Sequence, residues 1–307
     1  MKILITGTNG MVGKNLVERL RVNKDMTLFM PKRLDLDLLD KDSVFDYMCA
    51  NQPDLVIHLA AKVGGIQANI SEPVNFLVEN NLMNTHVIMG ALSAGVTQFL
   101  NLGSSCMYPR DKDILYESDI LTGELEPTNE GYALAKVMAA RLCTYITESR
   151  GLMYKTIVPC NIYGRYDHFD EARSHMVPAV IRKLHAAKIS GCTEVSIWGD
   201  GKSRREFMYV EDLVDFLVWA IPHMEQLPDM INVGLGLDYS IDEYYQIGAK
   251  VIGYTGVFTY DLYKPSGMRR KMMDVSKSQK LGWNAKTSLQ SGMEKTYEYY
   301  LKEVLHD

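Results

Sequence analysis

The feature that most constrains the fold of this chain is a glycine-rich turn close to its start. An apolar run, Lys2–Thr6, leads into residues 7–13, which read GxxGxxG with glycine at Gly7, Gly10 and Gly13. The first glycine would permit a tight turn, the second a close approach to a pyrophosphate, and the third close packing of a helix against a sheet. Because the turn follows a strand and opens a helix predicted over Met11–Leu20, with Val12 on one helical face, it predicts a dinucleotide-binding site at a helix N-terminus.

Short apolar strands alternate with helical patterns through the first half of the chain. Strand–helix–strand alternation predicts an α/β fold, a Rossmann-type doubly wound parallel sheet covered by helices on both faces. Further strands are predicted over 26–30, 54–59, 98–102, 155–158, 194–198 and 230–233, and further helices over 74–93, 129–149, 176–187, 213–221, 241–252 and 289–305. We expect residues 1–165 to form the cofactor domain, with a returning segment near 205–238, and the remainder of 166–307 to form a smaller, interleaved substrate lobe.

Composition excludes several classes of protein. Of 307 residues, 47% are apolar, enough for a large core, and the net charge of −5 argues against a nucleic-acid-binding protein. No apolar run reaches the roughly 20 residues of a membrane span, and the first residues lack the features of a secretory signal. The five scattered cysteines show no zinc-binding spacing, so we expect no metal and a reducing, cytoplasmic location.

The end of the second predicted strand bears on the choice of cofactor. An acidic residue there would bind the ribose 2′-hydroxyl of NAD, whereas a basic residue suits the 2′-phosphate of NADP. Lys32 and Arg33 come first after this strand, which favours NADP. The alternative is that both are solvated surface charges.

Two further features bear on chemistry. Tyr132 and Lys136 form a YxxxK pair on one face of the helix predicted over 129–149. A nearby ammonium lowers the pKa of a phenol, so that Tyr132 could exchange a proton with a carbonyl or alcohol oxygen near neutral pH. Ser104 follows the fourth predicted strand, at the edge of the sheet where ligands bind in such folds. Alone, the Tyr–Lys pair would be read as a surface pair, but the combination with Ser104 and the glycine turn is far more specific.

These features, in this order, resemble the extended short-chain dehydrogenase/reductase family, and among its members the epimerase-reductases of nucleotide sugars. The resemblance extends almost from end to end. The matching stretches are GMVG (10–13), HLAAKVGGI (58–66), GSSCMYP (103–109), EPTNEGYALAK (126–136), NIYG (161–164), SHMVPA (174–179), REF (205–207) and KPSGMRRKMMD (264–274).

The resemblance implies an NADPH-dependent conversion of a GDP-4-keto-6-deoxy-mannose-type sugar to a GDP-L-fucose-type product. The C4 ketone acidifies the hydrogens on C3 and C5, so inversion at these carbons needs a base on one face and an acid on the other. Cys106 and His175 match the family's acid/base pair, although a buried cysteine and a capping or surface histidine are the alternatives. Reduction at C4 would follow, with Tyr132 donating a proton, Ser104 binding the same oxygen and Lys136 holding the nicotinamide ribose.

The resemblance also implies a set of binding residues. For the cofactor these are Gly7, Gly10, Met11, Val12, Gly13, Arg33, Leu59, Ala60, Ala61, Tyr132, Lys136, Pro159, Asn161, Ile162 and His175, and for the GDP-linked sugar Asn161, Lys183, Trp198, Arg205 and Lys271. Trp198 would flank the guanine, or it is a core residue of its strand. Lys183 stands where an arginine is expected, and lysine cannot form a bidentate fork. Further positive charge would come from Arg204, Lys264, Arg269 and Arg270.

Other functions stay open. A related 4-keto sugar, such as a dideoxy sugar or a heptose, would satisfy the same motifs, and a 3-deoxy substrate would need inversion only at C5. A 4,6-dehydratase is disfavoured, because Thr-Asp-Glu would be expected where Ser105-Cys106 stands. A non-catalytic NADP-binding sensor would have no need of a proton donor. The resemblance further implies a homodimer formed through the helices predicted over 74–93 and 129–149.

Overall fold

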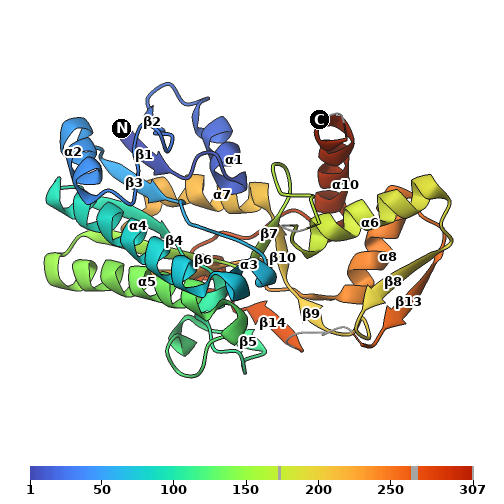
Figure 1. The fold of residues 1–307 in the computed structure, drawn as a ribbon. Helices are drawn as coiled ribbons and strands as arrows, with labels where there is room; N and C mark the ends of the chain where they lie inside the picture. Colours follow the sequence, from blue (N-terminus) through green and yellow to red (C-terminus); the bar gives the residue numbers. More distant parts are fainter. Residues whose placement is uncertain (172–173, 264–268, 306–307) are drawn as a thin grey trace.

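A six-stranded parallel sheet lies at the centre of the larger lobe of the protein (Figure 1). The computed structural model describes residues 1–171, 174–263 and 269–305. The strand order is β11-β6-β4-β3-β1-β2, and every pairing is parallel. The chain leaves β1 toward β2 on one side and returns to β3 on the other, so the ligand crevice of such a sheet lies at the ends of β1 and β3. The strands are β1 (Lys2–Thr6), β2 (Thr27–Phe29), β3 (Leu55–His58), β4 (Gln98–Leu102), β6 (Met153–Pro159) and β11 (Met230–Val233). The predicted Rossmann-type fold is confirmed.

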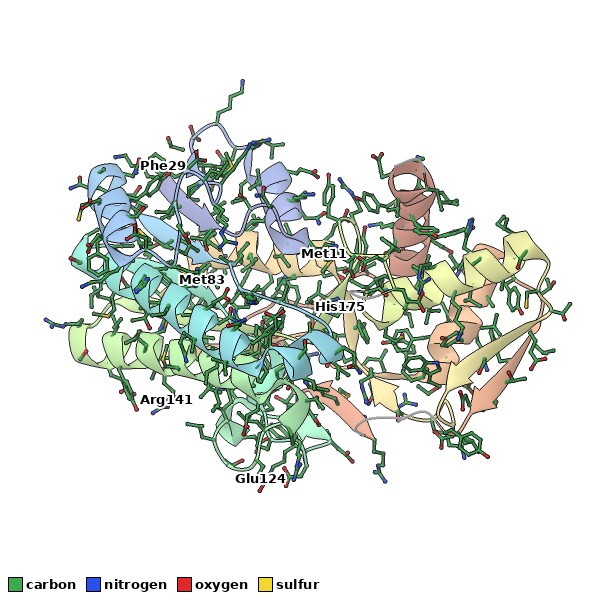
Figure 2. The ribbon with its side chains drawn as sticks, viewed as in Figure 1. Met11, Phe29, Met83, Glu124, Arg141 and His175 are labelled. Atoms are coloured by element: carbon green, nitrogen blue, oxygen red, sulfur yellow. The ribbon has the colours of Figure 1, made fainter. Side chains whose placement is uncertain are left out.

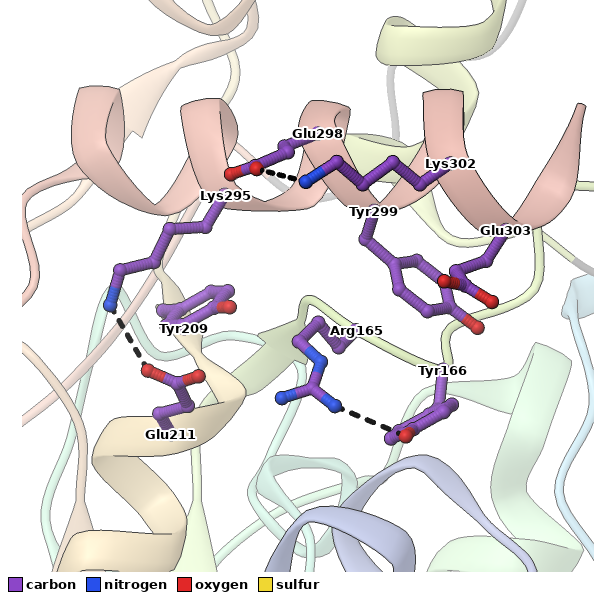
Figure 3. Close-up of a pocket in the computed structure, with 9 residues that line it drawn as sticks. All are labelled: Arg165, Tyr166, Tyr209, Glu211, Lys295, Glu298, Tyr299, Lys302 and Glu303. Carbon is purple, nitrogen blue, oxygen red and sulfur yellow. Dashed lines mark hydrogen bonds and ion pairs between the residues drawn. The ribbon is translucent and has the colours of Figure 1, made fainter.

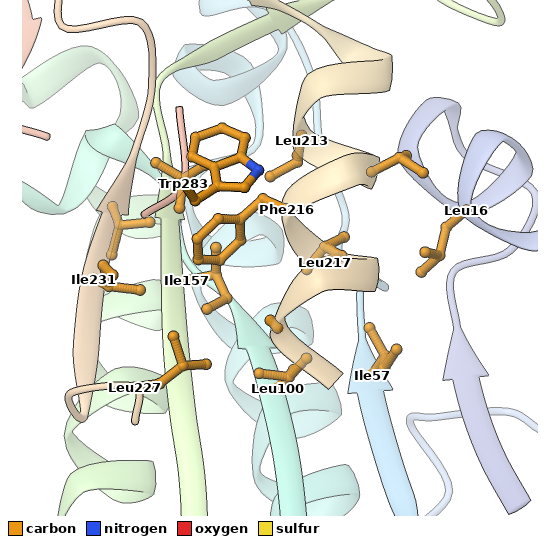
Figure 4. Packing of buried hydrophobic residues seen from close by; sticks show 14 of the residues in the cluster. Leu16, Ile57, Leu100, Ile157, Leu213, Phe216, Leu217, Leu227, Ile231 and Trp283 are labelled. Carbon is orange, nitrogen blue, oxygen red and sulfur yellow. The ribbon is translucent and has the colours of Figure 1, made fainter. Parts of the chain in front are cut away.

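Helices cover both faces of this sheet (Figure 1). Helices α1 (Met11–Leu20) and α7 (Val210–Ala220) lie together on one face, and α2 (Lys41–Asn51), α4 (Pro73–Ser93) and α5 (Glu130–Arg150) lie on the other. Alternation along the strands divides the core accordingly: Ile57 packs in the cluster of α1 and α7 (Figure 4), whereas its neighbour Val56 packs in that of α2, α4 and α5.

A second, smaller lobe is built from the C-terminal half (Figure 1). Helices α6 (Met176–Ser190), α8 (Ile241–Ile252) and α10 (Leu289–Tyr299) pack in one apolar cluster with the parallel pair β8 (Glu194–Trp198) and β13 (Val257–Asp261). Short strands run between the two parts. They are β5 (Ile114–Leu115), β7 (Asn161–Tyr163), β9 (Arg204–Arg205), β10 (Phe207–Tyr209), β12 (Tyr239–Ser240) and β14 (Arg270–Met273).

The sequence did not predict every element. Helix α2 has only Val44 and Met48 as buried residues, so its apolar periodicity is too weak to see. The predicted helix over 289–305 is interrupted, because α10 gives way to a π-helical turn, η5, at Tyr300–Val304. The remaining short elements are α3 (Ile66–Ser71), α9 (Ser276–Lys280), and the 3₁₀ turns η1 (Ser105–Met107), η2 (Glu117–Asp119), η3 (Pro127–Asn129) and η4 (Ile221–His223). Of the helices described, none has the length and apolar character that a bilayer crossing requires.

Candidate active site

The glycine turn has the geometry that its sequence implies. Gly7 has a φ of 74°, and a Cβ on it would lie 2.6 Å from the backbone nitrogen of Ala60; a Cβ on Gly13 would lie 2.3 Å from the carbonyl oxygen of Gly7. Gly10 is different, because its Cβ would meet that same oxygen only at an ordinary 3.5 Å. Protein packing therefore requires glycine at the first and third positions but leaves open space at the second, as a pyrophosphate would need.

The start of α1 is also suited to an anion. No side chain among the described residues caps the helix, and its first turn carries no acidic residue, so its free N–H groups face the crevice. The other residues expected to touch the cofactor surround this turn. They lie at the start of α1, after β3, and at the end of β6 and in β7: Met11, Val12, Leu59, Ala60, Ala61, Pro159, Asn161 and Ile162. Lys32 and Arg33 are exposed, just beyond β2.

A buried polar chain fixes the segment after β3. His58 is fully buried between the hydroxyl of Thr6, 2.7 Å from its Nδ1, and the side-chain oxygen of Asn84, 3.0 Å from its Nε2. Burial lowers the pKa of His58 to about 3, so the ring is neutral. Asn84 in turn donates to the carbonyl oxygen of Ala135, and Ala60 donates its N–H to Thr6. The segment after β3 and helix α5 are thus connected through the side chain of His58.

Ser104, Cys106, Tyr132 and Lys136 come together at the end of β4. The Tyr132 hydroxyl hydrogen-bonds Ser104, and the Lys136 Nζ, 5.9 Å from the centre of the Tyr132 ring, donates to the carbonyl oxygen of Leu102 at 2.7 Å. The backbone N–H of Cys106 donates to the Ser104 Oγ at 3.2 Å. Cys106 is partly exposed, whereas Cys143 and Cys160 are buried, so it is not the small core residue that free cysteines usually are.

One electrostatic expectation was wrong. Lys136 does not lower the pKa of Tyr132 here: burial raises the phenol's pKa, negative charge on Cys106 raises it further, and the hydrogen bond from Ser104 only partly opposes both. Burial also lowers the pKa of Lys136 to about 8. Burial therefore keeps Tyr132 protonated, so that it can act as a proton donor.

His175 approaches from the smaller lobe. It occupies the N-cap position of α6, where the two lobes meet (Figure 2), but its side chain caps nothing in the described chain. Its Nδ1 lies 3.6 Å from Oδ1 of Asp167, and this carboxylate raises the pKa of the imidazole. Within the described residues, no hydrogen bond or ion pair joins His175 to Cys106 or Tyr132. Convergence of these groups on one sugar therefore stays a prediction.

Several of the predicted cations are already neutralised. Arg204 and Arg270 share the buried carboxylate of Asp238, and Arg204 also reaches Glu243 at 3.3 Å. Arg269 is exposed and paired with Asp113. Lys264 lies outside the described residues.

Three other cations differ from these. Lys183, Arg205 and Lys271 have no carboxylate partner in the part of the chain that the structure describes. Arg205 and Lys271 are register partners on β9 and β14, and burial lowers the pKa of both Arg205 and Lys183. Adjacent like charges in a sheet repel each other, so this pair calls for an anion.

The remaining substrate candidates lie near this group of cations. Trp198, at the end of β8, is 61% exposed, so its alternative reading as a core residue was wrong. Asn161 donates its side-chain N–H to the carbonyl oxygen of Glu206. Glu206 itself is 1% exposed and accepts hydrogen bonds from the backbone N–H groups of Leu235, Gly236 and Met273, and burial raises its pKa to about 7.

A cavity of about 450 Å³ opens elsewhere, between α10 and the segment after β7 (Figure 3). Its three cations are all paired: Arg165 with Glu18, Lys295 with Glu211 and Lys302 with Glu298. None of the predicted site residues lines it. This charge-balanced cavity is therefore separate from the candidate site.

Three residues that the structure brings into play had not been singled out from the sequence. Asn129 contacts the thiol of Cys106, Asp167 faces His175, and Glu206 organises the backbone around Asn161. Asn129 lies within the stretch EPTNEGYALAK, which offered a signal. Glu206 likewise lies within the matching stretch REF (205–207), whereas Asp167 carried no signal, because nothing in the sequence pairs it with His175.

Comparisons with known proteins agree with this geometry. Residues 3–234 match the model of the NAD dependent epimerase/dehydratase family. The chain is 52% identical over 309 residues to the GDP-L-colitose synthase of Yersinia pseudotuberculosis, covering 100% of both chains. It is 45% identical over 301 residues to the GDP-L-fucose synthase of Azorhizobium caulinodans, covering 98% of this chain and 96% of the relative.

A solved structure adds the same fold. The GDP-mannoheptose C4 reductase of Campylobacter jejuni, determined with NADP bound, superposes with a TM-score of 0.91 at 29% identity and covers 98% of each chain. The chain therefore belongs to the NAD dependent epimerase/dehydratase family, and within it to the group of GDP-sugar enzymes that contains the GDP-L-fucose synthases.

Proposed function

We propose that the protein is an NADPH-dependent epimerase-reductase of a GDP-linked 4-keto-6-deoxy sugar, inverting C3 and C5 and then reducing C4 to a GDP-L-fucose-type product. The cluster of Ser104, Cys106, Tyr132 and Lys136 beside the glycine turn carries this proposal. It combines a proton donor and a thiol within reach of one cofactor crevice.

The residues around β4 account for reduction. NADPH, when bound, supplies a hydride to C4. Tyr132 donates a proton to the C4 oxygen, and its raised pKa keeps that proton in place until negative charge develops on the oxygen. Ser104 holds the same oxygen, and the Lys136 ammonium, anchored on Leu102, supplies positive charge beneath the phenol.

Cys106 and His175 account for epimerisation. The C4 carbonyl stabilises the carbanion that forms when the Cys106 sulfur removes a proton from C3 or C5. His175 then delivers a proton to the opposite face, which inverts the carbon. The contact between Asp167 and His175 supports the assignment of His175 as the acid, because the carboxylate favours the protonated ring.

The unpaired cations suit a nucleoside diphosphate. Arg205 and Lys271, side by side on β9 and β14, would bind the diphosphate, with Lys183 adding a third positive charge. The exposed Trp198 would flank the guanine. For the cofactor, Arg33 beyond β2 supports NADP, and so does the NADP-bound Campylobacter relative.

A second substrate is favoured by one observation. The identity to GDP-L-colitose synthase, 52%, exceeds that to the GDP-L-fucose synthase described above, 45%. Colitose is a 3,6-dideoxy sugar, so its 4-keto precursor needs inversion at C5 alone. The same cluster of residues serves either substrate, and the difference lies in how many times Cys106 and His175 act.

We further propose a homodimer in the cytoplasm. Val74, Val78 and Leu82 form an exposed apolar stripe along α4, and Leu134 and Tyr145 continue it on the neighbouring α5. A second copy of the same stripe would cover it. All five cysteines are free thiols, in keeping with a reducing compartment.

The test is product analysis by NMR. The protein is incubated in D₂O with NADPH and either GDP-4-keto-6-deoxy-mannose or its 3-deoxy counterpart. NADPH oxidation with deuterium at both C3 and C5 supports the fucose-type reaction, and preferred turnover of the 3-deoxy sugar with deuterium at C5 supports the second candidate. Cofactor binding with neither oxidation nor exchange would leave the non-catalytic sensor.

A further inference from the structure

Asp167 is a buried carboxylate, and the mechanism above uses only its charge, which favours the protonated ring of His175. Its side chain is only 3% exposed, and its Oδ1 accepts the backbone N–H of His168 at 2.8 Å while lying 3.6 Å from Nδ1 of His175. Its second oxygen, Oδ2, is buried and has no hydrogen-bond partner among the described residues. The carboxylate thus has capacity left for a donor.

The position of His175 makes this contact necessary. A protonated ring at the N-cap of α6 lies at the positive end of a helix dipole, where a cation is disfavoured. The charged group that faces the ring within the described chain is Asp167. A buried carboxylate likewise needs a positive partner, so each group offsets the cost of the other.

The segment that carries Asp167 is attached to helix α1. The backbone N–H of Asp167 donates to the carbonyl oxygen of Gly164. Arg165, the residue after Gly164, is bound twice to α1: the side chain of Asn15 donates to the carbonyl oxygen of Arg165, and Glu18 binds the guanidinium of Arg165. Residues 164–167 therefore connect α1 to the carboxylate that faces the His175 ring.

We infer that Asp167 is the positioning residue for His175: it accepts the Nδ1–H, which leaves Nε2–H directed at the sugar as the proton that is delivered in epimerisation. This inference rests on the proposed function. In each inversion His175 gives its Nε2 proton to the carbon that Cys106 has deprotonated on the other face, and the neutral ring keeps its Nδ1–H on Asp167. Solvent returns the ring proton and removes that of the thiol.

The test isolates proton transfer by replacing NADPH with NADP⁺, so that no hydride can be delivered. Deuterium uptake at C5 of GDP-4-keto-6-deoxy-mannose is then followed in D₂O. Asp167→Asn keeps the shape of the side chain. We expect this variant to slow deuterium uptake by about 10- to 100-fold, which is less than the full rate contribution of a general acid. Its affinity for NADP⁺ should be unchanged. The pKa of His175, followed by NMR on histidine-labelled enzyme, should fall in this variant.

Two controls separate positioning from folding. Asp212→Asn removes another buried aspartate, which accepts the backbone N–H groups of Lys286 and Thr287, and it should lower the melting temperature without slowing exchange. Adding Asp167→Asn to His175→Ala should cause no further loss if Asp167 acts through the ring.

The outcomes also separate the two proposals. Exchange at the wild-type rate in Asp167→Asn, or an additive loss in the double variant, would overturn the role of Asp167 while leaving the proposed function standing. Absence of exchange in the wild-type enzyme would overturn the proposed function itself, and with it this inference.

Discussion

The side-chain amide of Asn129 lies 3.1 Å from the sulfur of Cys106, with the Nδ2–H donating to Sγ. Asn129 immediately precedes α5, the helix that carries Tyr132 and Lys136. The thiol assigned to epimerisation and the phenol assigned to reduction are therefore placed by the same short stretch of chain. Under the proposed function, this arrangement would let both reactions act on one sugar without the substrate leaving the site.

Asn129→Ala is expected to slow deuterium uptake at C5 by roughly 10-fold, because an N–H donor that can stabilise negative charge on the sulfur is lost. Stability should change little, since the Asn129 side chain caps no N–H of α5 in the described chain. Exchange is measured with NADP⁺ bound. Thr128→Ala, one residue earlier, is the control, and equal losses in the two variants would contradict the role of the amide.

Cys106→Ser is expected to abolish inversion but leave direct reduction of the C4 ketone, because the serine hydroxyl is a far weaker base at neutral pH while the groups around Tyr132 are untouched. NADPH should still be oxidised, and product NMR should show a reduced sugar with its original configuration at C5. Unchanged deuterium uptake at C3 and C5 would exclude the assignment. Cys49→Ser, at an exposed cysteine on α2, is the matched control.

Tyr132→Phe is expected to lower the rate of C4 reduction by about 10²- to 10⁴-fold, the usual contribution of a general acid. Only the hydroxyl is removed, so NADPH binding, read from the quenching of its fluorescence or by calorimetry, should persist. Deuterium exchange at C5 should also persist, since it needs no proton from this phenol. Near-normal turnover would be decisive against the proton-donor role.

The sequence could predict the cofactor half of the fold more fully than the substrate half, for a physical reason. Buried parallel strands such as β1 and β4 are short and mostly apolar, so they can be recognised from the sequence. The glycine turn marks the place where a ligand must approach the backbone. Strands β9 and β14 contain arginine and lysine instead, so their pairing is invisible until Asp238 is seen between Arg204 and Arg270.

The candidate site shows the same division. Tyr132 and Lys136 are four residues apart on one helix, so their proximity could be anticipated from spacing, whereas Cys106 was assigned to the same site through the family resemblance. The partners of Cys106 and His175, namely Asn129 and Asp167, could not, because side-chain contacts depend on the path of loops. The raised pKa of Tyr132 was missed for a related reason: burial, which outweighs every neighbouring group, is a property of the folded chain.

Glu206 is expected to make stability fall as the pH rises. Its folded-state pKa, raised to about 7 by burial, exceeds its ordinary value of 4.5, so the folded state binds its proton more tightly. The stabilisation, up to about 3 kcal/mol, is complete below about pH 4.5 and is lost progressively as the pH rises from there through 7. Glu206→Gln cannot ionise, and its amide would face the N–H of Met273. Urea unfolding at pH 5 to 8 should show the wild-type advantage shrinking with pH; a constant difference would contradict this.

Val78→Asp is expected to convert a dimer of the 34.8 kDa chain to monomers, because it places one carboxylate from each copy inside the apolar stripe on α4 and α5. Light scattering after size-exclusion chromatography measures the mass, and Val22→Asp, at a 79% exposed valine beyond α1, should leave it unchanged. A wild-type monomer would reject the dimer. Since the residues proposed for chemistry and binding all come from one chain, monomers of Val78→Asp should keep NADPH affinity and C5 exchange. Loss of both in a folded monomer would show that dimerisation holds α5, and with it Tyr132 and Lys136, in place.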